Sequence, residues 1–465
     1  AELPWSHEQS SMDYLGYADN QYNLDQLAEL QGNFPLTELL QFWGMDESEY
    51  YIVYEPSFVR YLGKIYNEKN LEAMKAYFIV HTALEALMYL DVESAEDAAV
   101  LMQADNEDET MGEEEEPGEE IEINSQLSEE EEQILEIAST YLFPNLIDAI
   151  QQVYIGRHFS SQMREEVLAL VEDIKEYYIE LLKNTEWLGP ETREEGIRKL
   201  NNMYVHVFYP DVLTDYSGLD YLNYEEGGNL LDAIYDIRTF NFTPESEKIN
   251  QAVDRGEWDL SSVNTLASNA YYMLMNNSVY ILAGIAAGGI TYGLDSPLEQ
   301  NYARLGMIIG HEITHAFDNS GYNFDADGLE NKWWTSEDEV AFRMKADRLA
   351  NHYGTLSFLP GVEGGYDGTI VQGEAIADMG GMKCMLALAE DIPDFDYEKF
   401  FISYANLFCY KTDLGSEMQL AMDVHPLGFL RTNVTVQQFD EFFETFDIGP
   451  GDGMYLAPED RIMVW

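Results

Sequence analysis

Three residues in the segment GHEITHAFDNSG, residues 310–321, have the types and spacing that metal chemistry needs. His311 and His315 are four residues apart, so on a helix they share one face and can point at one metal ion. Imidazole nitrogens at this spacing suit Zn²⁺, which proteins bind tetrahedrally. Glu312 lies about 100° further round the helix, where it can activate a metal-bound water without binding the metal. The segment predicts a hydrolytic zinc site; the alternative is an ordinary structural helix.

A third ligand is predicted in the segment GEAIAD, residues 373–378. Glu374 and Asp378 are four residues apart at the start of an apolar stretch. One carboxylate can bind the metal while the other accepts a hydrogen bond from the free N–H of a ligand histidine. Asp318, three residues after His315, can serve the other histidine in the same way. A single acid among 87 is more often a solvated surface charge, but the position of this pair before an apolar helix favours a site.

The charge of the chain makes nucleic acid a poor partner. Its 465 residues contain 24 Lys and Arg against 87 Asp and Glu, a formal net charge of -63. A phosphate backbone would be repelled, so we expect no nucleic acid partner. The longest apolar stretch, YILAGIAAGGITYGL, is too short and too rich in glycine for a transmembrane segment. The acidity favours an extracellular or cell-surface protein in processed form, with a cytoplasmic location as the alternative.

The chain is long enough for two lobes. We predict a mainly α fold with a mostly helical lobe at residues 1–230, which contains an acidic disordered insertion at about residues 104–133. Residues 231–465 are predicted to form a zincin-like catalytic lobe with a small β element, because NAYYMLM at 269–275 has a strand-like pattern. Whether Cys384 and Cys409 pair cannot be read from the sequence.

Several segments occur in the order typical of one family. They are VYIGRHFSSQM, WLGPETREEGIRKLNNM, FYPD, NAYYMLMNN, GHEITHAFDNSGYNFDADGLENKWW, GEAIADMGG, DVHPLGFLR and MYLAPEDRIMVW. In these segments the chain resembles the neprilysin family of zinc metallopeptidases, which includes the endothelin-converting enzymes and bacterial oligopeptidases. The resemblance covers nearly the whole chain, and Ile462, where eukaryotic members have a cysteine, makes the chain similar to bacterial members.

The resemblance implies a role for each residue of the zinc motif. His311, His315 and Glu374 would bind one zinc ion, and Glu312 would be the base that activates the water. The acids that would orient the two histidines are Asp318 and Asp378.

The resemblance also implies how a peptide is bound. His425 would stabilise the oxyanion of the transition state, and Arg431 would hold a substrate carbonyl. Asn269 and Ala270 would bind the substrate backbone as an added edge strand. The walls of an apolar specificity pocket are expected from Ile285, Ile308 and Phe408, for which ordinary core positions are the alternative.

The expected function is therefore zinc-dependent endopeptidase activity on short peptides. One departure from the family is length, since the long N-terminal helical segment usual in the family is expected to be missing here or supplied by a partner chain. The alternative function is a zinc-binding but catalytically inactive peptide-binding protein.

Overall fold

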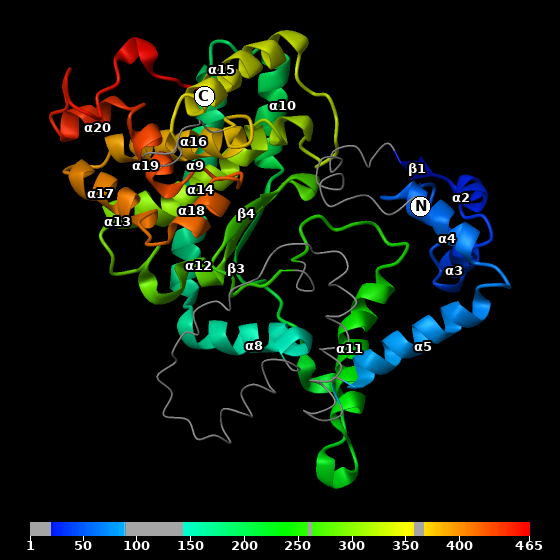
Figure 1. Cartoon of the computed structure of the whole chain (residues 1–465). Helices are drawn as coiled ribbons and strands as arrows, with labels where there is room; N and C mark the ends of the chain where they lie inside the picture. The colour runs from blue at the N-terminus through cyan, green and yellow to red at the C-terminus, as the bar shows by residue number, and fades with distance from the viewer. Residues whose placement is uncertain (1–19, 88, 90–142, 259–262, 358–366) are drawn as a thin grey trace. The chain divides into compact units, whose positions relative to one another are not determined.

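The computed structural model describes residues 20–87, 89, 143–258, 263–357 and 367–465 (Figure 1). The acidic insertion predicted at about residues 104–133 lies outside these residues. Contacts divide the chain into two compact units, one of residues 1–150 and 214–253 and the other of residues 151–213 and 254–465. The predicted fold class, mainly α with two lobes, is confirmed. The lobe boundary at residue 230 stays a prediction.

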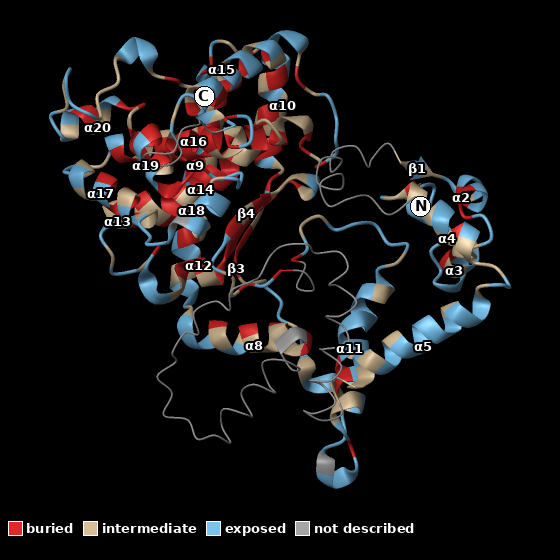
Figure 2. Ribbon diagram, in the orientation of Figure 1, coloured by how far each residue is buried: buried red, intermediate tan, exposed pale blue. Residues whose placement is uncertain are grey.

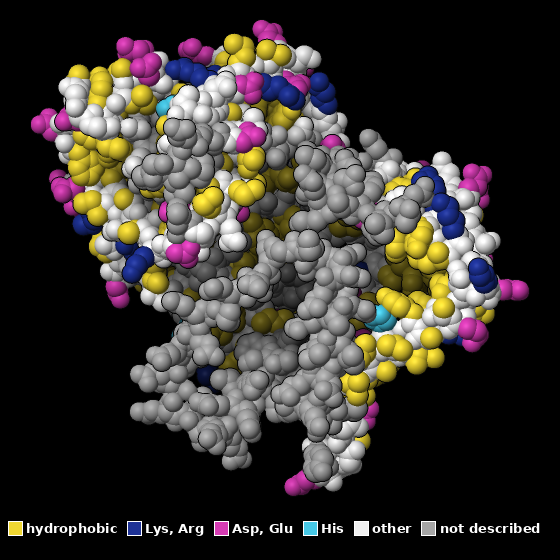
Figure 3. All heavy atoms as spheres, in the orientation of Figure 1, with side chains coloured by type: hydrophobic (Ala, Val, Ile, Leu, Met, Phe, Trp, Pro, Cys, Tyr) yellow, Lys and Arg dark blue, Asp and Glu magenta, His cyan; other side chains and the backbone are white. Residues whose placement is uncertain are grey.

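The first unit contains small helices around a small core. Asn23 caps the helix that begins at Leu24 by accepting a hydrogen bond from the backbone N–H of Gln26. The buried core residues of this unit include Leu27, Leu30 and Leu40. Hydrophobic side chains also gather on the surface around α4 and α5 (Figure 3), and α5 has no buried residue (Figure 2). The elements are β1 (Gln21–Tyr22), α2 (Leu24–Leu30), α3 (Leu36–Phe42), β2 (Tyr51–Ile52), α4 (Pro56–Ile65), α5 (Leu71–Leu87), the start of α8 (Phe143–His158) and α11 (Leu230–Glu247).

The second unit begins with two helices whose ends are set by local sequence. Ser160 caps α9 (Ser161–Asn184), and Pro190 occupies the first turn of α10 (Pro190–Asn201). Apolar residues at three- and four-residue steps form the buried face of α9. They are Val167, Leu170, Val171, Ile174, Tyr178 and Leu182.

A three-stranded sheet follows these helices. β3 (Tyr204–Phe208) pairs in parallel with β5 (Ser278–Leu282), and β5 pairs antiparallel with β4 (Ala270–Met273). The order is β3-β5-β4, so β4 is at an edge. The strand predicted in NAYYMLM is therefore present, and within the described residues it pairs with one strand, β5.

The remaining helices surround the central pair α14 (Met307–Thr314) and α16 (Gln372–Glu390). α14 follows α13 (Leu298–Asn301) through a π-helical turn, Tyr302–Gly306, and continues into a 3-10 turn, His315–Phe317. His315 therefore lies just past the last residue of the α-helix, in the 3-10 turn, whereas the sequence pattern places it on the same helix as His311. The other helices are α12 (Ala283–Ala286), α15 (Ser336–Gly354), α17 (Tyr397–Leu407), α18 (Leu414–Leu420), α19 (Gly428–Val436) and α20 (Asp440–Thr445).

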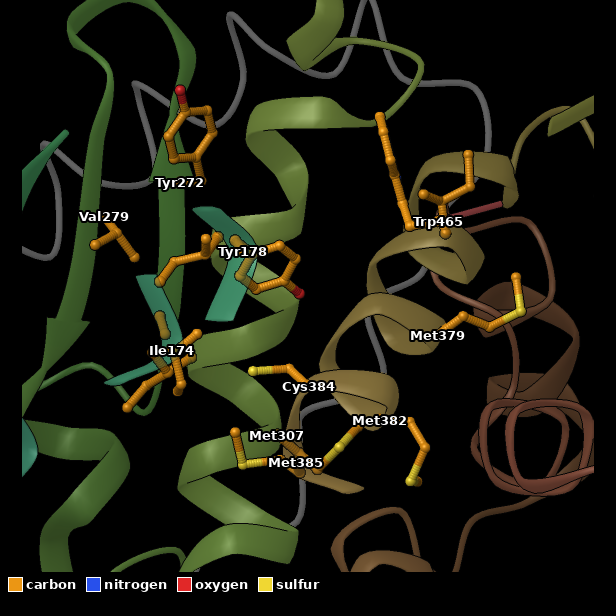
Figure 4. Packing of buried hydrophobic residues seen from close by; sticks show 14 of the residues in the cluster. Ile174, Tyr178, Tyr272, Val279, Met307, Met379, Met382, Cys384, Met385 and Trp465 are labelled. Atoms are coloured by element: carbon orange, nitrogen blue, oxygen red, sulfur yellow. The ribbon is translucent and has the colours of Figure 1, made fainter. Parts of the chain in front are cut away.

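Glycines allow α14 and α16 to cross at very short range. A Cβ atom on Gly310 would lie 2.9 Å from the Cα of Gly381, and one on Gly381 would lie 2.7 Å from the carbonyl oxygen of Met307. Figure 4 shows Met307, Cys384 and Met385 in the packed core beside this crossing. The crossing therefore fixes how the two helices with the predicted metal ligands face each other.

The two cysteines are both free. Cys384 is buried in α16 and Cys409 is exposed, which answers the question that the sequence left open. Among the helices that the structure describes, none is both long and apolar enough to cross a membrane.

Candidate active site

The three predicted metal ligands converge on one point. Nε2 of His311 lies 3.1 Å from Nε2 of His315 and 3.1 Å from Oε2 of Glu374. Nε2 of His315 lies 3.7 Å from Oε1 of Glu374. One ligand atom from each residue can be chosen so that all lie within 4.8 Å of one another. α14 with its 3-10 extension supplies the two histidines, and the first turn of α16 supplies the carboxylate.

The other ring nitrogen of each histidine is held by an acid. Nδ1 of His311 is 2.8 Å from Oδ1 of Asp378, and Nδ1 of His315 is 2.6 Å from Oδ2 of Asp318. Each Nδ1–H thus donates to a carboxylate, which leaves the Nε2 lone pair for a metal. Asp318 is itself fixed, because its Oδ1 accepts the backbone N–H groups of Ser320 and Gly321.

This arrangement fits a zinc ion. Zinc–nitrogen bonds of about 2.0–2.1 Å at tetrahedral angles separate two nitrogens by roughly 3.3 Å, close to the distance between the two Nε2 atoms. Two lone pairs that face each other at this distance repel unless a proton or a cation lies between them. Burial alone would lower the pKa of His311, but hydrogen bonds with Asp378 and Glu374 raise it to about 10, so protons compete with metal for this position.

Glu312 lies beside this centre on the same helix. Glu312 is 8 % exposed. Burial raises the pKa of its carboxyl group above the usual value for a glutamate, even though His311 and His315 oppose the shift. A carboxylate with a raised pKa accepts and returns protons closer to neutral pH than an exposed one. The environment of Glu312 therefore suits a general base.

His425 reaches the centre from the loop before α19. Its Nε2 is 3.1 Å from Oε2 of Glu374, and its Nδ1 is 2.7 Å from Oδ1 of Asp423. The adjacent carboxylate of Glu374 raises the pKa of His425, which favours its cationic form. Asp423 was not predicted; its place two residues before His425 in the segment DVHPLGFLR was the available signal.

Arg431 is bound to one of the orienting acids. Its Nε and Nη2 donate to Oδ2 and Oδ1 of Asp378 at 2.9 and 2.7 Å, and its guanidinium stacks on Phe408. Asp378 thus serves both Arg431 and His311, a connection that the sequence spacing does not reveal. Only Nη1 of the guanidinium takes no part in this pair, and Arg431 still lines the cavity described next.

Two adjoining cavities flank the centre, and both are lined by Asn269, Ala270, His311, Glu312 and His425. The first, of about 290 Å³, brings together all three predicted pocket residues, Ile285, Ile308 and Phe408. The second, of about 390 Å³, extends past His315, Asp318 and Glu374. Asn269 and Ala270, at the start of β4, therefore line both cavities beside the predicted metal ligands.

Comparison with known proteins agrees with this geometry. Residues 1–210 and 269–462 each match a model of Peptidase family M13. The neutral endopeptidase of Lactococcus lactis subsp. lactis is 31% identical over 467 residues, which cover 98% of this chain and 68% of that protein. Human neprilysin is 28% identical over 349 residues, 70% of this chain and 45% of neprilysin.

Solved structures give the same result. The crystal structure of PEPO from Lactobacillus rhamnosis has a TM-score of 0.73 and 26% identity, covering 97% of this chain and 68% of that one. The open state of the Mycobacterium tuberculosis zinc metalloprotease shares the fold, with a TM-score of 0.76, 23% identity, and coverage of 99% and 70%. The chain therefore belongs to Peptidase family M13, and the expected class, a metallopeptidase related to neprilysin, is confirmed.

Proposed function

We propose that the chain is a zinc-dependent endopeptidase that cleaves short peptides with one zinc ion held by His311, His315 and Glu374. The main support is the convergence of their ligand atoms next to Glu312. The names of its relatives, neutral endopeptidase and neprilysin, agree with this proposal.

The edge strand β4 is the proposed binding site for the substrate backbone. An extended peptide can pair with the open side of β4 through Asn269 and Ala270, both of which line the two cavities. Backbone pairing does not distinguish one peptide side chain from another, so specificity comes from the pockets that bind individual side chains. We propose that the pocket with Ile285, Ile308 and Phe408 receives an apolar side chain next to the cleaved bond.

The chemistry divides among the residues of the site. Zinc, when bound, supplies a Lewis acid that polarises the scissile carbonyl and makes a water molecule more acidic. Glu312 takes a proton from the attacking water and passes it to the leaving amine. His425 and Arg431 face the carbonyl oxygen as negative charge develops on it.

The decisive experiment combines metal analysis with peptide cleavage. The purified wild type and the Glu312→Gln variant are both expected to contain one zinc per chain. Only the wild type is expected to cleave a short-peptide library, and a chelator is expected to abolish this cleavage. Glu176→Gln, the same change at an exposed position of α9, is the control and should cleave normally.

Two other outcomes would change the proposal. Zinc in both proteins with cleavage by neither would favour the alternative, a peptide-binding protein without activity. A wild type that binds no zinc would contradict both functions.

The proposed location is outside the cytoplasm, at the cell surface or beyond it. The support is the acidic composition, with 87 Asp and Glu against 24 Lys and Arg. Fractionation of the source cells, with the chain found only in the cytoplasm, would contradict it.

A further inference from the structure

Lys199 in α10 is a fully buried lysine with no role in the proposed chemistry. Its exposed fraction is 0%. Burial lowers its pKa to about 7, although Asp318, Asp325 and Glu195 favour the charged form from a distance. Within the described part of the chain it forms no ion pair with any of these acids. A buried lysine without a close carboxylate needs another source of compensation.

Backbone carbonyl groups supply that compensation. Nζ donates hydrogen bonds to the carbonyl oxygens of Ala316 at 2.9 Å, Gly321 at 2.7 Å and Phe324 at 2.6 Å. An ammonium group has three donors, and three acceptors use them all, whereas a neutral amine has only two. The geometry therefore matches the charged form of Lys199.

The three carbonyl groups belong to the segment that holds one metal ligand in place. Ala316 follows His315 directly, and Gly321 donates its own N–H to Oδ1 of Asp318. Oδ2 of Asp318 in turn accepts a hydrogen bond from Nδ1–H of His315. Lys199 thus joins the start, the middle and the end of the segment on which the Asp318–His315 hydrogen bond depends.

The backbone of Lys199 is also connected to the substrate strand. Its carbonyl oxygen accepts a hydrogen bond from Nδ2 of Asn277 at 2.9 Å. Asn277 is buried, and its Oδ1 accepts a hydrogen bond of 2.7 Å from the hydroxyl group of Tyr272 in β4. One residue therefore contacts both the metal-ligand segment and, through Asn277, the edge strand β4.

We propose that Lys199 is a positioning residue, which fixes the carboxylate of Asp318 against His315 and sets the metal-ligand segment relative to β4. This role rests on the proposed function, because it concerns the geometry of that site. Substitution of Lys199 is expected to loosen metal binding without removing any ligand. Substitution of a residue that only stabilises the fold would lower the melting temperature but leave the zinc affinity unchanged.

The test is Lys199→Met, which keeps much of the side-chain volume and removes the charge and the donors. Zinc affinity is measured by competition with a chelator, well below the melting temperature of every variant. We expect affinity to fall about tenfold, the low end of the range typical when a partner of a ligand histidine is lost, because Asp318 is still present. The control is Lys345→Met in α15, where Nζ donates to the carbonyl oxygen of Met463; its affinity should equal that of the wild type.

Amide hydrogen exchange gives a readout that is independent of metal. The N–H groups of Ser320 and Gly321, which donate to Asp318, should exchange faster in metal-free Lys199→Met than in the metal-free wild type. A wild type without zinc would refute the proposed function, and the exchange data would still decide the role of Lys199. Unchanged zinc affinity and unchanged exchange, with only a lower melting temperature, would overturn the proposal.

A milder variant covers the case in which Lys199→Met does not fold. Lys199→Gln keeps two N–H donors on a shorter side chain and is expected to show a smaller loss of zinc affinity of the same kind. If neither variant folds, Lys199 is a residue of the folding core and the proposal is wrong.

Discussion

Asp378 accepts hydrogen bonds from Nδ1–H of buried His311 and from the partly buried guanidinium of Arg431. Its replacement by alanine should therefore do two things. Without metal, the partly buried guanidinium loses its partner, which is expected to cost about 3 kcal/mol of unfolding free energy, the low end of the range for buried ion pairs. Zinc affinity should also fall about 10- to 100-fold because His311 is no longer oriented. Denaturant unfolding of the metal-free protein and chelator competition measure the two effects.

Asp318 provides the matched control because it orients His315 but binds no arginine. Asp318→Ala should lower zinc affinity to a similar extent. Its effect on metal-free stability should be smaller, about 1–3 kcal/mol, from the lost hydrogen bonds to Ser320 and Gly321. Equal losses of metal-free stability in the two variants would show that Arg431 does not depend on Asp378.

Single residues of the site differ in how well the sequence predicts them. His311, Glu312 and His315 can be proposed from spacing alone, because the helix period places their side chains. Their roles stay predictions, although the structure brings the predicted ligands together. The pairing of Arg431 with Asp378 and the contacts of Lys199 depend on segments that meet only in the folded chain, so no local pattern reveals them.

At the level of elements, the crossing of α14 and α16 sets the distance between the histidines and Glu374. A Cβ on Gly381 would lie 2.7 Å from the carbonyl oxygen of Met307 and 3.0 Å from the backbone nitrogen of His311. Gly381→Ala should push the helices apart, with a loss of about 1–3 kcal/mol, and should weaken zinc binding. Thermal unfolding and chelator competition test this.

Gly156 in α8 is the control for this substitution. A Cβ there would meet nothing within 4 Å, and alanine favours a helix over glycine by about 0.5–1 kcal/mol. Gly156→Ala should leave zinc affinity unchanged and stability equal or higher. Unchanged zinc binding in Gly381→Ala would mean that the crossing does not set the ligand geometry.

The sheet contains a stack of rings across its three strands, and this stack predicts a pH effect. His206 in β3 stacks on Tyr280 in β5, which stacks on Tyr271 in β4. Burial lowers the pKa of His206 to about 4, against about 6.5 in an unfolded chain. Between these values the unfolded state binds a proton that the folded state does not, so the free energy of unfolding falls as the pH drops from about 6.5 to about 4.

His206→Phe keeps a ring in the stack and removes the titration. Its melting temperature should therefore fall less steeply over this pH range than that of the wild type. His158→Phe makes the same change at an exposed position of α8 and should keep the wild-type slope. Parallel melting curves for His206→Phe and the wild type would show that His206 does not contribute to acid sensitivity.

The elements were predicted best where the signals are local. The strand predicted in NAYYMLM is present as β4, and Pro190 in the first turn of α10 and the periodic apolar face of α9 are local signals of the same kind. The π-helical turn before α14 and the end of α14 at Thr314 were not predicted. These details depend on packing against α16 rather than on the period of the sequence, since Gly306 lies against Met385 of that helix.

On the scale of the whole molecule, the net charge of -63 should influence which peptides reach the site. A strongly negative protein attracts cationic ligands over long distances and repels anionic ones, which changes association rates about tenfold or more at low salt. A peptide with two lysines should therefore have a higher kcat/KM than the same peptide with two glutamates. kcat should differ less, because the field acts mainly before binding.

Salt separates this long-range effect from contacts inside the groove. The Debye length falls from about 30 Å at 0.01 M to about 3 Å at 1 M salt, so the preference for the lysine peptide should shrink as salt is added. A neutral peptide of the same length is the control and should show a nearly constant kcat/KM. A preference that stayed constant over this range would have to come from direct contacts, such as those of Arg431 and Glu312 with the bound peptide. A faster reaction of the glutamate peptide at low salt would show that the local positive charge of Arg431 and the metal outweighs the field of the whole chain.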